Sequence, residues 1–233
     1  MKTSFLTAAI LVAPLFLAAC NENEPDTAKA EPQATGEWTD SRDNHVYFWV
    51  QYGNQQWTTT NLAYHVAGDT IYEGYSNSAA ERAQNLADFG RLYTHAQALQ
   101  AVPAEGGWRL PTDKDWQELE QYMGMSARDA ARTDWRGNIA SLVLSIGTQR
   151  KTPLNLLLGG YFTGHTIMGT SGFRFKDAAG YYWTATRDTQ KEGEYYFYRR
   201  LFYNRADIYR QSMEPTAQRL SVRLVRDARH TTN

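Results

Sequence analysis

The last third of the chain breaks into short aromatic segments, and this pattern constrains the fold more than any other feature of the sequence. Across residues 154–227, short runs rich in Tyr, Phe, Trp and Val alternate with Gly, Asp and Asn. Aromatic and β-branched residues suit half-buried strands, and the intervening residues suit turns. The pattern predicts about four or five strands. The last of them carries Leu220, Val222 and Leu224 in alternation with polar residues, which predicts a strand with one buried face.

A hairpin and a helical region precede these strands. Residues 46–59 alternate apolar and polar side chains around a turn, which predicts a β-hairpin. Thr94 and Thr112 each precede apolar residues at helical spacing, and a threonine hydroxyl caps helix N-termini well. Ser126 begins another capped segment, and residues 138–147 suit a further helix. We therefore predict an α+β domain: a mostly antiparallel twisted sheet with two or more flanking helices and long loops.

The segment GGWRLPTDKDW, residues 106–116, has the regularity of a signature. Its proline keeps Leu110 extended, which places Thr112 outside the helix that follows. Asp115 stands three residues after Thr112, as in a shortened capping box, and Trp116 begins an apolar stripe. Each of these residue types serves the start of a helix. We interpret the segment as structural rather than as part of an active site.

The first 19 residues predict a lipoprotein signal peptide. A positive start is followed by a short apolar segment and by Leu-Ala-Ala before Cys20, the only cysteine of the chain. The apolar segment is too short for a spanning helix, and its ending is typical of a bacterial lipobox. We expect cleavage before Cys20, a thioether-linked diacylglycerol on its sulfur and further acyl chains such as palmitate, which together anchor stably. The alternative is an ordinary signal peptide.

The mature chain is expected to have three parts. Residues 20–36 are polar, acidic and Pro-containing, which predicts a disordered tether after the lipidated cysteine. Residues 37–228 have the length of one domain with one core, and residues 229–233 form a tail. The acidic start of the tether is compatible with sorting to the outer membrane. We therefore expect a protein of the bacterial cell envelope, anchored to the outer membrane and facing the periplasm or the surface.

Composition excludes several classes of site. The domain contains no cysteine, so it holds neither a disulfide nor a thiolate zinc site. Its net charge is −1 and no basic run occurs, which argues against a nucleic-acid partner. The location outside the cytoplasm argues against nucleotide cofactors.

Five motifs appear in an order that resembles the Fibrobacter succinogenes major paralogous domain family. They are TDSRDN, FGRLYT, GGWRLPTDKDW, GYYWTAT and LSVRLVRD, spread over residues 38–227. The resemblance implies a C-type-lectin-like fold, related to formylglycine-generating domains, and an envelope location rather than an activity. The motif residues that it marks as structural are Trp57, Asn61, Trp108, Leu110, Thr112, Trp116, Trp183 and Arg223.

The chain departs from this family's pattern in informative places. Leu224 stands where many members have a cysteine, and the partner cysteine before the Gly-Trp motif is also missing. An apolar contact is expected in place of that disulfide. Asn44 replaces a turn glycine, Asp115 a glutamate and His95 a tryptophan. Without cysteines, the copper chemistry of the formylglycine-generating enzymes is excluded.

No catalytic motif stands out, and we expect a protein that is not an enzyme. The sequence has no nucleophile elbow and no pair of histidines at ligand spacing. A hydrolase with two carboxylates distant in sequence is a less favoured alternative. We expect all the histidines on the surface or in loops: His45, His65, His95, His165 and His230.

Calcium is the one cofactor that the sequence leaves open. Asp40, Asp43 and Asn44 lie close together and carry oxygen ligands of the kind that Ca²⁺ prefers. The same residues are ordinary turn formers, and we favour that interpretation.

The aromatic strands carry the functional hypothesis. Alternate residues of a strand face opposite sides, so half of the rings and arginines in 195–210 could form an open platform for sugars or a protein. The alternative is that helices and loops cover both faces. The candidate ligand-binding residues are Tyr196, Tyr198, Arg199, Arg200, Tyr203 and Arg205. We expect a non-catalytic binding or surface-display module, with polysaccharide as its candidate ligand; the alternative is an accessory lipoprotein that docks another envelope protein.

Overall fold

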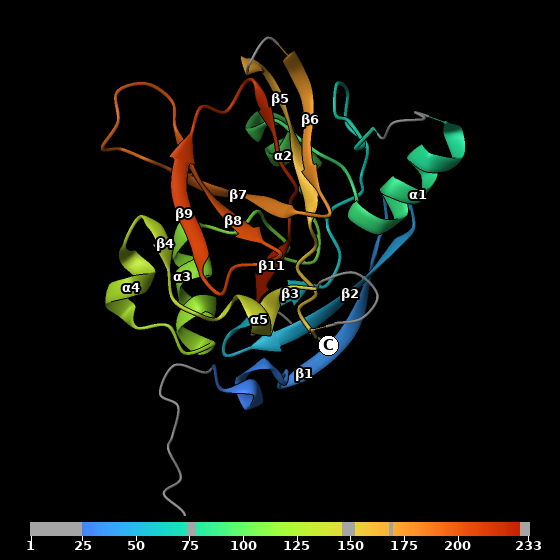
Figure 1. Cartoon of the computed structure of the whole chain (residues 1–233). Coiled ribbons are helices and arrows are strands. Elements are labelled where there is room, and N and C mark those ends of the chain that lie inside the picture. Colours follow the sequence, from blue (N-terminus) through green and yellow to red (C-terminus); the bar gives the residue numbers. More distant parts are fainter. Residues whose placement is uncertain (1–24, 74–77, 146–151, 168–169, 229–233) are drawn as a thin grey trace, which may run out of the picture.

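The computed structural model describes residues 25–73, 78–145, 152–167 and 170–228. In this part of the chain, two sheets lie together with helices packed around them (Figure 1). This confirms the α+β prediction. Cys20, the signal peptide, the side chain of His165 and the tail with His230 lie outside the described residues.

The smaller sheet has four antiparallel strands in the order β1-β2-β3-β11. Its strands are β1 Ala34–Asp40, β2 His45–Tyr52, β3 Gln55–Thr58 and β11 Val225–Asp227. The pairing of β2 with β3 confirms the hairpin predicted for residues 46–59. Because β11 pairs with β3, the C-terminal end of the domain is joined to its N-terminal hairpin.

The ordered domain begins earlier than the sequence indicated. A short 3₁₀ helix, η1 Thr27–Ala30, precedes β1. The hydroxyl of Tyr52 donates to the carbonyl of Ala30 at 2.8 Å, and Ala30 is buried. We expected the disordered tether to extend to residue 36, and this boundary is wrong because ordered elements begin at Thr27. The polar composition of this stretch gave no sign of the buried Ala30 or of β1, which is held in place by its pairing with β2.

The larger sheet has seven strands. They are β4 Asp134–Arg136, β5 Gly159–Ile167, β6 Thr170–Lys176, β7 Ala179–Arg187, β8 Tyr196–Phe202, β9 Ile208–Met213 and β10 Gln218–Arg219. Their order is β10-β5-β7-β8-β9-β4, with β6 beside β5. All pairs are antiparallel except β5 with β7. Strands β4 and β9 were not among the predicted ones.

Five α-helices surround the sheets in the described residues. They are α1 Ala79–Phe89, α2 His95–Ala101, α3 Asp113–Tyr122, α4 Ala127–Ala131 and α5 Ala140–Val143. The predicted starts at Thr94, Thr112 and Ser126 are confirmed, because each side chain accepts a hydrogen bond from the backbone of its helix. Helix α1 lies in a polar stretch where none was predicted. None of the helices described is both long enough and apolar enough to cross a membrane.

Helix α3 begins as the GGWRLPTDKDW segment predicted. Thr112 and Asp115 form a reciprocal capping box. Trp116 and Leu119 are buried, and the Trp116 ring packs against that of Trp57 with centroids 5.0 Å apart. The segment thus fixes a helix onto the core between the two sheets.

The segment before β11 corrects one prediction. Both Val222 and Arg223 are fully buried, so the expectation of a strand with one open face is wrong. The guanidinium of Arg223 donates to Asn61 Oδ1 and to the carbonyl of Thr58, each at 2.7 Å. An arginine can be buried here because fixed oxygens satisfy its N–H groups. Leu224 joins the apolar cluster that contains Leu110.

Candidate functional site

The larger sheet presents two faces, and β8 contributes neighbouring arginines to both. Arg199 bonds to carboxylates of α3, on the side that we call the inner face. Arg200 lies in register with Tyr181 of β7 and Tyr209 of β9, on the opposite side that we call the outer face. The alternation of a strand thus places two adjacent arginines in different surroundings.

The inner face holds a buried ionic cluster. Asp113 and Glu120 stand seven residues apart on α3 and therefore share one side of the helix. Arg199 donates to both carboxylates at 2.7 Å. Arg136 pairs with Glu120 and Arg210 pairs with Asp113, also at 2.7 Å. Three arginines against two carboxylates leave the cluster with one net positive charge.

The cluster changes the titration of Asp113. Burial raises the pKa of its carboxyl, but the hydrogen bonds and charges of Arg210 and Arg199 outweigh burial and lower the pKa to about 2. The carboxylate is therefore ionised at every physiological pH. It positions arginines and is not placed to exchange protons.

Two of the candidate ligand-binding residues are inaccessible to a ligand in this arrangement, and their assignment is wrong. Arg199 is fully buried and bonded to two carboxylates, so a ligand cannot reach it. Tyr198 is buried as well, with 6% of its surface exposed, because its ring lies between those of Tyr181 and Tyr209. Sequence alternation showed that half of the span would turn inward, but not which half.

The outer face carries a closed circuit of aromatic rings, which we call the aromatic face. Each ring contacts the next and the last contacts the first, with successive centroids between 4.6 and 6.2 Å apart. Strands β4 to β9 all contribute to it. Its members are Trp135, Tyr161, Phe175, Tyr181, Tyr198, Phe202 and Tyr209.

Arg200 lies within this circuit. Its guanidinium carbon is 4.1 Å from the ring centroid of Tyr209 and 4.9 Å from that of Trp135. Its Nε is buried without a hydrogen-bond partner among the described residues. No described carboxylate lies within 4.0 Å of it, whereas Arg205 at the edge is paired with Asp207 at 2.7 Å.

Arg200 also acts on the hydroxyl of Tyr181. Burial raises the pKa of Tyr181 to about 12, although the charge of Arg200 and its hydrogen bond to the hydroxyl act in the opposite direction.

The remaining candidates lie apart from the circuit. The Tyr196 ring stacks on that of His95 with centroids 3.5 Å apart. His95 is buried, with Nε2 2.9 Å from the carbonyl of Thr184, so the expectation of a surface or loop position is wrong for it. Burial lowers its pKa. Tyr203 is 53% exposed, just beyond β8.

The aromatic face contains residues that sequence reasoning missed. Trp135 comes from β4, and Tyr161 and Phe175 come from the neighbouring strands β5 and β6. Only the strand order brings them beside β8. The sequence shows that these residues are aromatic and lie in or near short strands, but it does not show that their side chains contact one another.

The turn considered for calcium is occupied by an arginine. Arg42 donates to both carboxylate oxygens of Asp40, at 2.8 and 2.6 Å. Asp43 accepts from the backbone of His45, and Asn44 adopts a φ of 60° as a turn residue. A calcium ion would have to displace Arg42. The described residues also contain no group of three His, Cys, Asp or Glu placed to bind a metal.

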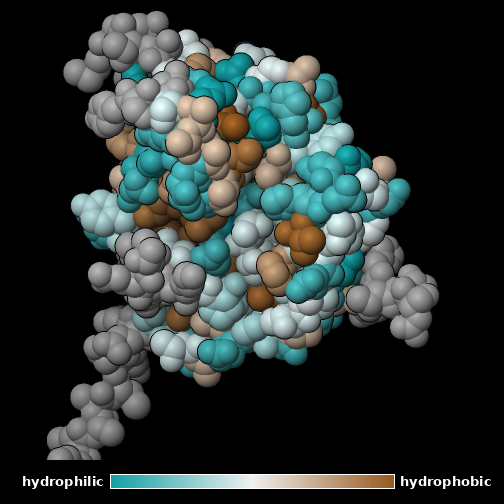
Figure 2. Space-filling view, turned by 90° about the vertical axis from the view of Figure 1, so that its right-hand side faces the viewer, coloured by the Kyte–Doolittle hydropathy of each residue, from teal (hydrophilic) through white to brown (hydrophobic). Residues whose placement is uncertain are grey.

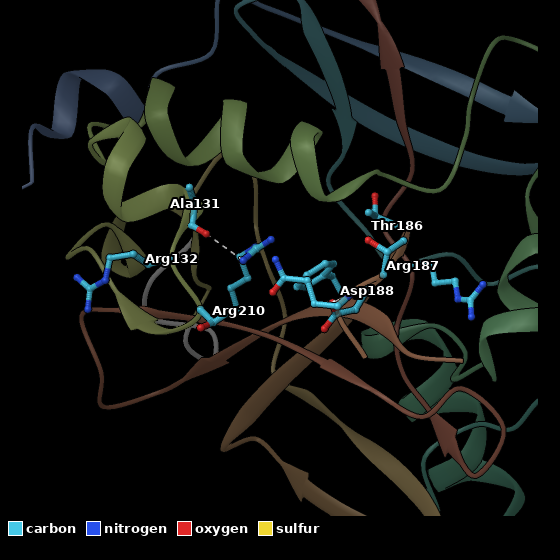
Figure 3. A pocket seen from close by; sticks show the side chains of 10 residues that line it. Ala131, Arg132, Thr186, Arg187, Asp188 and Arg210 are labelled. Atoms are coloured by element: carbon cyan, nitrogen blue, oxygen red, sulfur yellow. Dashed lines mark hydrogen bonds between the residues drawn. The ribbon is translucent and has the colours of Figure 1, made fainter. Parts of the chain in front are cut away.

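A polar hollow of about 730 Å³ lies at the edge of the inner face (Figure 3). Arg210 forms its floor and donates to the carbonyl of Ala131 at 3.0 Å, while Arg132 and Arg187 point outward at its rim. Asp188 is the one carboxylate among the lining residues, and it accepts from Ser212 at 2.5 Å. The hollow thus lacks the two facing carboxylates of a glycoside hydrolase.

The face carrying α1 and the β1–β2 hairpin has a different character. Hydrophobic side chains appear there as small separate patches between hydrophilic ones (Figure 2). Val46 and Phe48 are exposed on β2. Scattered apolar residues of this kind are ordinary on protein surfaces and mark no site.

Comparison with known proteins identifies one family. The sequence model of the Fibrobacter succinogenes major domain matches residues 50–226. No curated protein and no solved structure matches the chain.

Proposed function

The chain belongs to the Fibrobacter succinogenes major domain family, and we propose that it is a lipid-anchored, non-catalytic module that binds polysaccharide on its aromatic face. The observation that carries the proposal is the closed circuit of seven rings on an outer sheet face. Tyr181 and Tyr198 are buried beneath it, and the other five rings are partly or fully exposed. Aromatic rings offer large rigid surfaces at little cost in side-chain entropy, and tyrosines add hydroxyls. Sugar rings stack on such surfaces.

The conformation of Phe175 supports a functional role for this face. Its side chain is 48% exposed and its φ is 61°. A bulky residue rarely adopts a positive φ, and such strain costs on the order of 1–3 kcal/mol where it occurs. Strained residues concentrate at binding sites, so an exposed aromatic held this way favours a ligand contact.

The anchor and the fold complete the proposal. We place the lipid on Cys20 and the domain in the cell envelope, at the outer membrane, and we assign it a C-type-lectin-like fold on the order of its motifs. Since η1 begins at Thr27, six residues separate Cys20 from the ordered domain. At about 3.5 Å per residue, this linker spans about 20–25 Å at most. The domain would therefore work close to the membrane surface.

A glycan and cell-wall polysaccharide array tests the proposal. Purified full-length protein in detergent is expected to bind at least one polysaccharide. Phe175→Ala should weaken that binding, whereas Phe48→Ala should not, because Phe48 is similarly exposed but lies on the other sheet. Silence across the array would contradict the proposal and would favour a protein partner docked on the same rings.

A further inference from the structure

We infer that the polysaccharide bound by the aromatic face is acidic and that Arg200 binds its anionic group. The inference rests on the proposed function and adds the chemical class of the ligand to it. The shared chemistry is an oxyanion on a sugar, either a carboxylate or a sulfate.

The first step is the missing counter-ion. The buried guanidinium groups of the inner face have carboxylate partners, as Arg199 does with Asp113 and Glu120. Arg223 has an amide and carbonyl oxygens instead. Arg200 differs from all of these, because its Nε is buried without a partner and no described carboxylate lies within salt-bridge distance. Arg200 as a whole is only partly buried, so its positive charge, which has no described counter-ion, is open to an anionic ligand.

The second step is the fixed position of the guanidinium. Its carbon lies within 5.9 Å of the ring centroids of Tyr181, Trp135, Phe202 and Tyr209. These rings hold the group through cation–π attraction, but their faces accept no strong hydrogen bond in the plane of the guanidinium. A planar guanidinium held in this way is prepared for two parallel hydrogen bonds to one oxyanion.

The third step is the charge of the surroundings. Arg205 at the edge is neutralised by Asp207. The aromatic face therefore has a positive centre, and sugars that stack on its rings would meet that charge.

The experiment compares matched polysaccharides on full-length protein in detergent. The probes are oligogalacturonate, the same oligosaccharide with its carboxyls reduced to alcohols, dextran sulfate and dextran. We expect the charged member of at least one pair to bind about tenfold or more tightly than its neutral match. The two pairs distinguish a carboxylate ligand from a sulfate ligand.

The variants locate the charge. Arg200→Met should remove most of that preference, and Arg200→Lys should retain part of it. Arg205→Met is the control, because it removes the same charge at the exposed edge, where screening should limit the loss to about two- to threefold. Melting temperatures of each variant report on folding separately. Equal affinity for charged and neutral sugars, or an unchanged preference in Arg200→Met, would overturn the inference and leave the proposed function standing. Silence with every sugar would overturn both.

Discussion

Arg199 and Arg200 are neighbours on β8, but they lie in different surroundings on opposite faces of the sheet. Arg199 points to the inner face, is fully buried and binds two carboxylates. Arg200 points to the outer face, is partly buried and packs on rings without a carboxylate. A buried charge that has its partners serves the fold, whereas one held without them is available to a ligand. Exposure alone does not make this distinction, because Arg205 is more exposed than either and is already paired.

The strongest test of this comparison is the balance of charge on the inner face. Glu120→Gln would leave three buried arginines facing Asp113 alone. Arg199→Met would leave two arginines facing two carboxylates, each with one remaining partner. Removing one side of a buried ion pair costs about 3–5 kcal/mol when the other charge is stranded. We expect Glu120→Gln to reach that range and Arg199→Met to cost less.

Urea unfolding of both variants, followed by tryptophan fluorescence, measures the difference. An Arg199→Met variant as unstable as Glu120→Gln would show that hydrogen-bond geometry, rather than net charge, governs the cluster.

A change in pH tests the ionic cluster of the inner face without a mutation. The pKa of Asp113 is lowered in the folded state to about 2, below its value of about 4 in an unfolded chain. Folding therefore gains stability from this group above pH 4 and loses it as the pH falls from about 4 to about 2. The loss is about 2 kcal/mol. The free energy of unfolding should fall over this range, and less steeply in Asp113→Asn; identical slopes would contradict the assignment.

The inner face was partly predictable and the aromatic face was not. Thr112, Asp115 and the apolar stripe that follows are local signals, so the start and register of α3 could be derived from the sequence. The pairing of Asp113 with Arg210 depends on where β9 lies, and β9 gave no clear strand signal. Local patterns define elements, but contacts between distant elements depend on strand order.

The same limit explains the errors on β8. Alternation requires Arg199 and Arg200 to face opposite sides, yet both were named as candidates because either face could have been the buried one. Only α3, which covers the inner side, decides between them. The rings that β4, β5 and β6 contribute to the circuit become its members only in the folded sheet.

On the outer face, removal of the charge should hardly affect stability. Arg200→Met keeps the apolar stem of the side chain among the rings and removes a cation that has no counter-ion. The lost cation–π attraction, about 0.5–2 kcal/mol, is offset by the relieved desolvation. We expect a net change below about 1 kcal/mol in the urea experiment, well short of that for Glu120→Gln. A loss of several kcal/mol would place Arg200 with Arg199 as a structural residue.

The smallest expected effect comes from freeing the charge of Arg205, which would then lack a carboxylate partner, as Arg200 does. Asp207 holds Arg205 through two hydrogen bonds of 2.7 Å, and the guanidinium carbon of Arg205 lies 4.0 Å from the ring centroid of Trp135. Asp207→Asn would free that charge at the edge of the aromatic face. Because exposed charges are well screened, affinity for the preferred acidic polysaccharide should rise only about two- to threefold at low salt, and the gain should vanish at high salt. A decrease in affinity would mean that the Arg205–Asp207 pair itself shapes the binding surface, so that pairing alone would not separate structural from ligand-binding arginines.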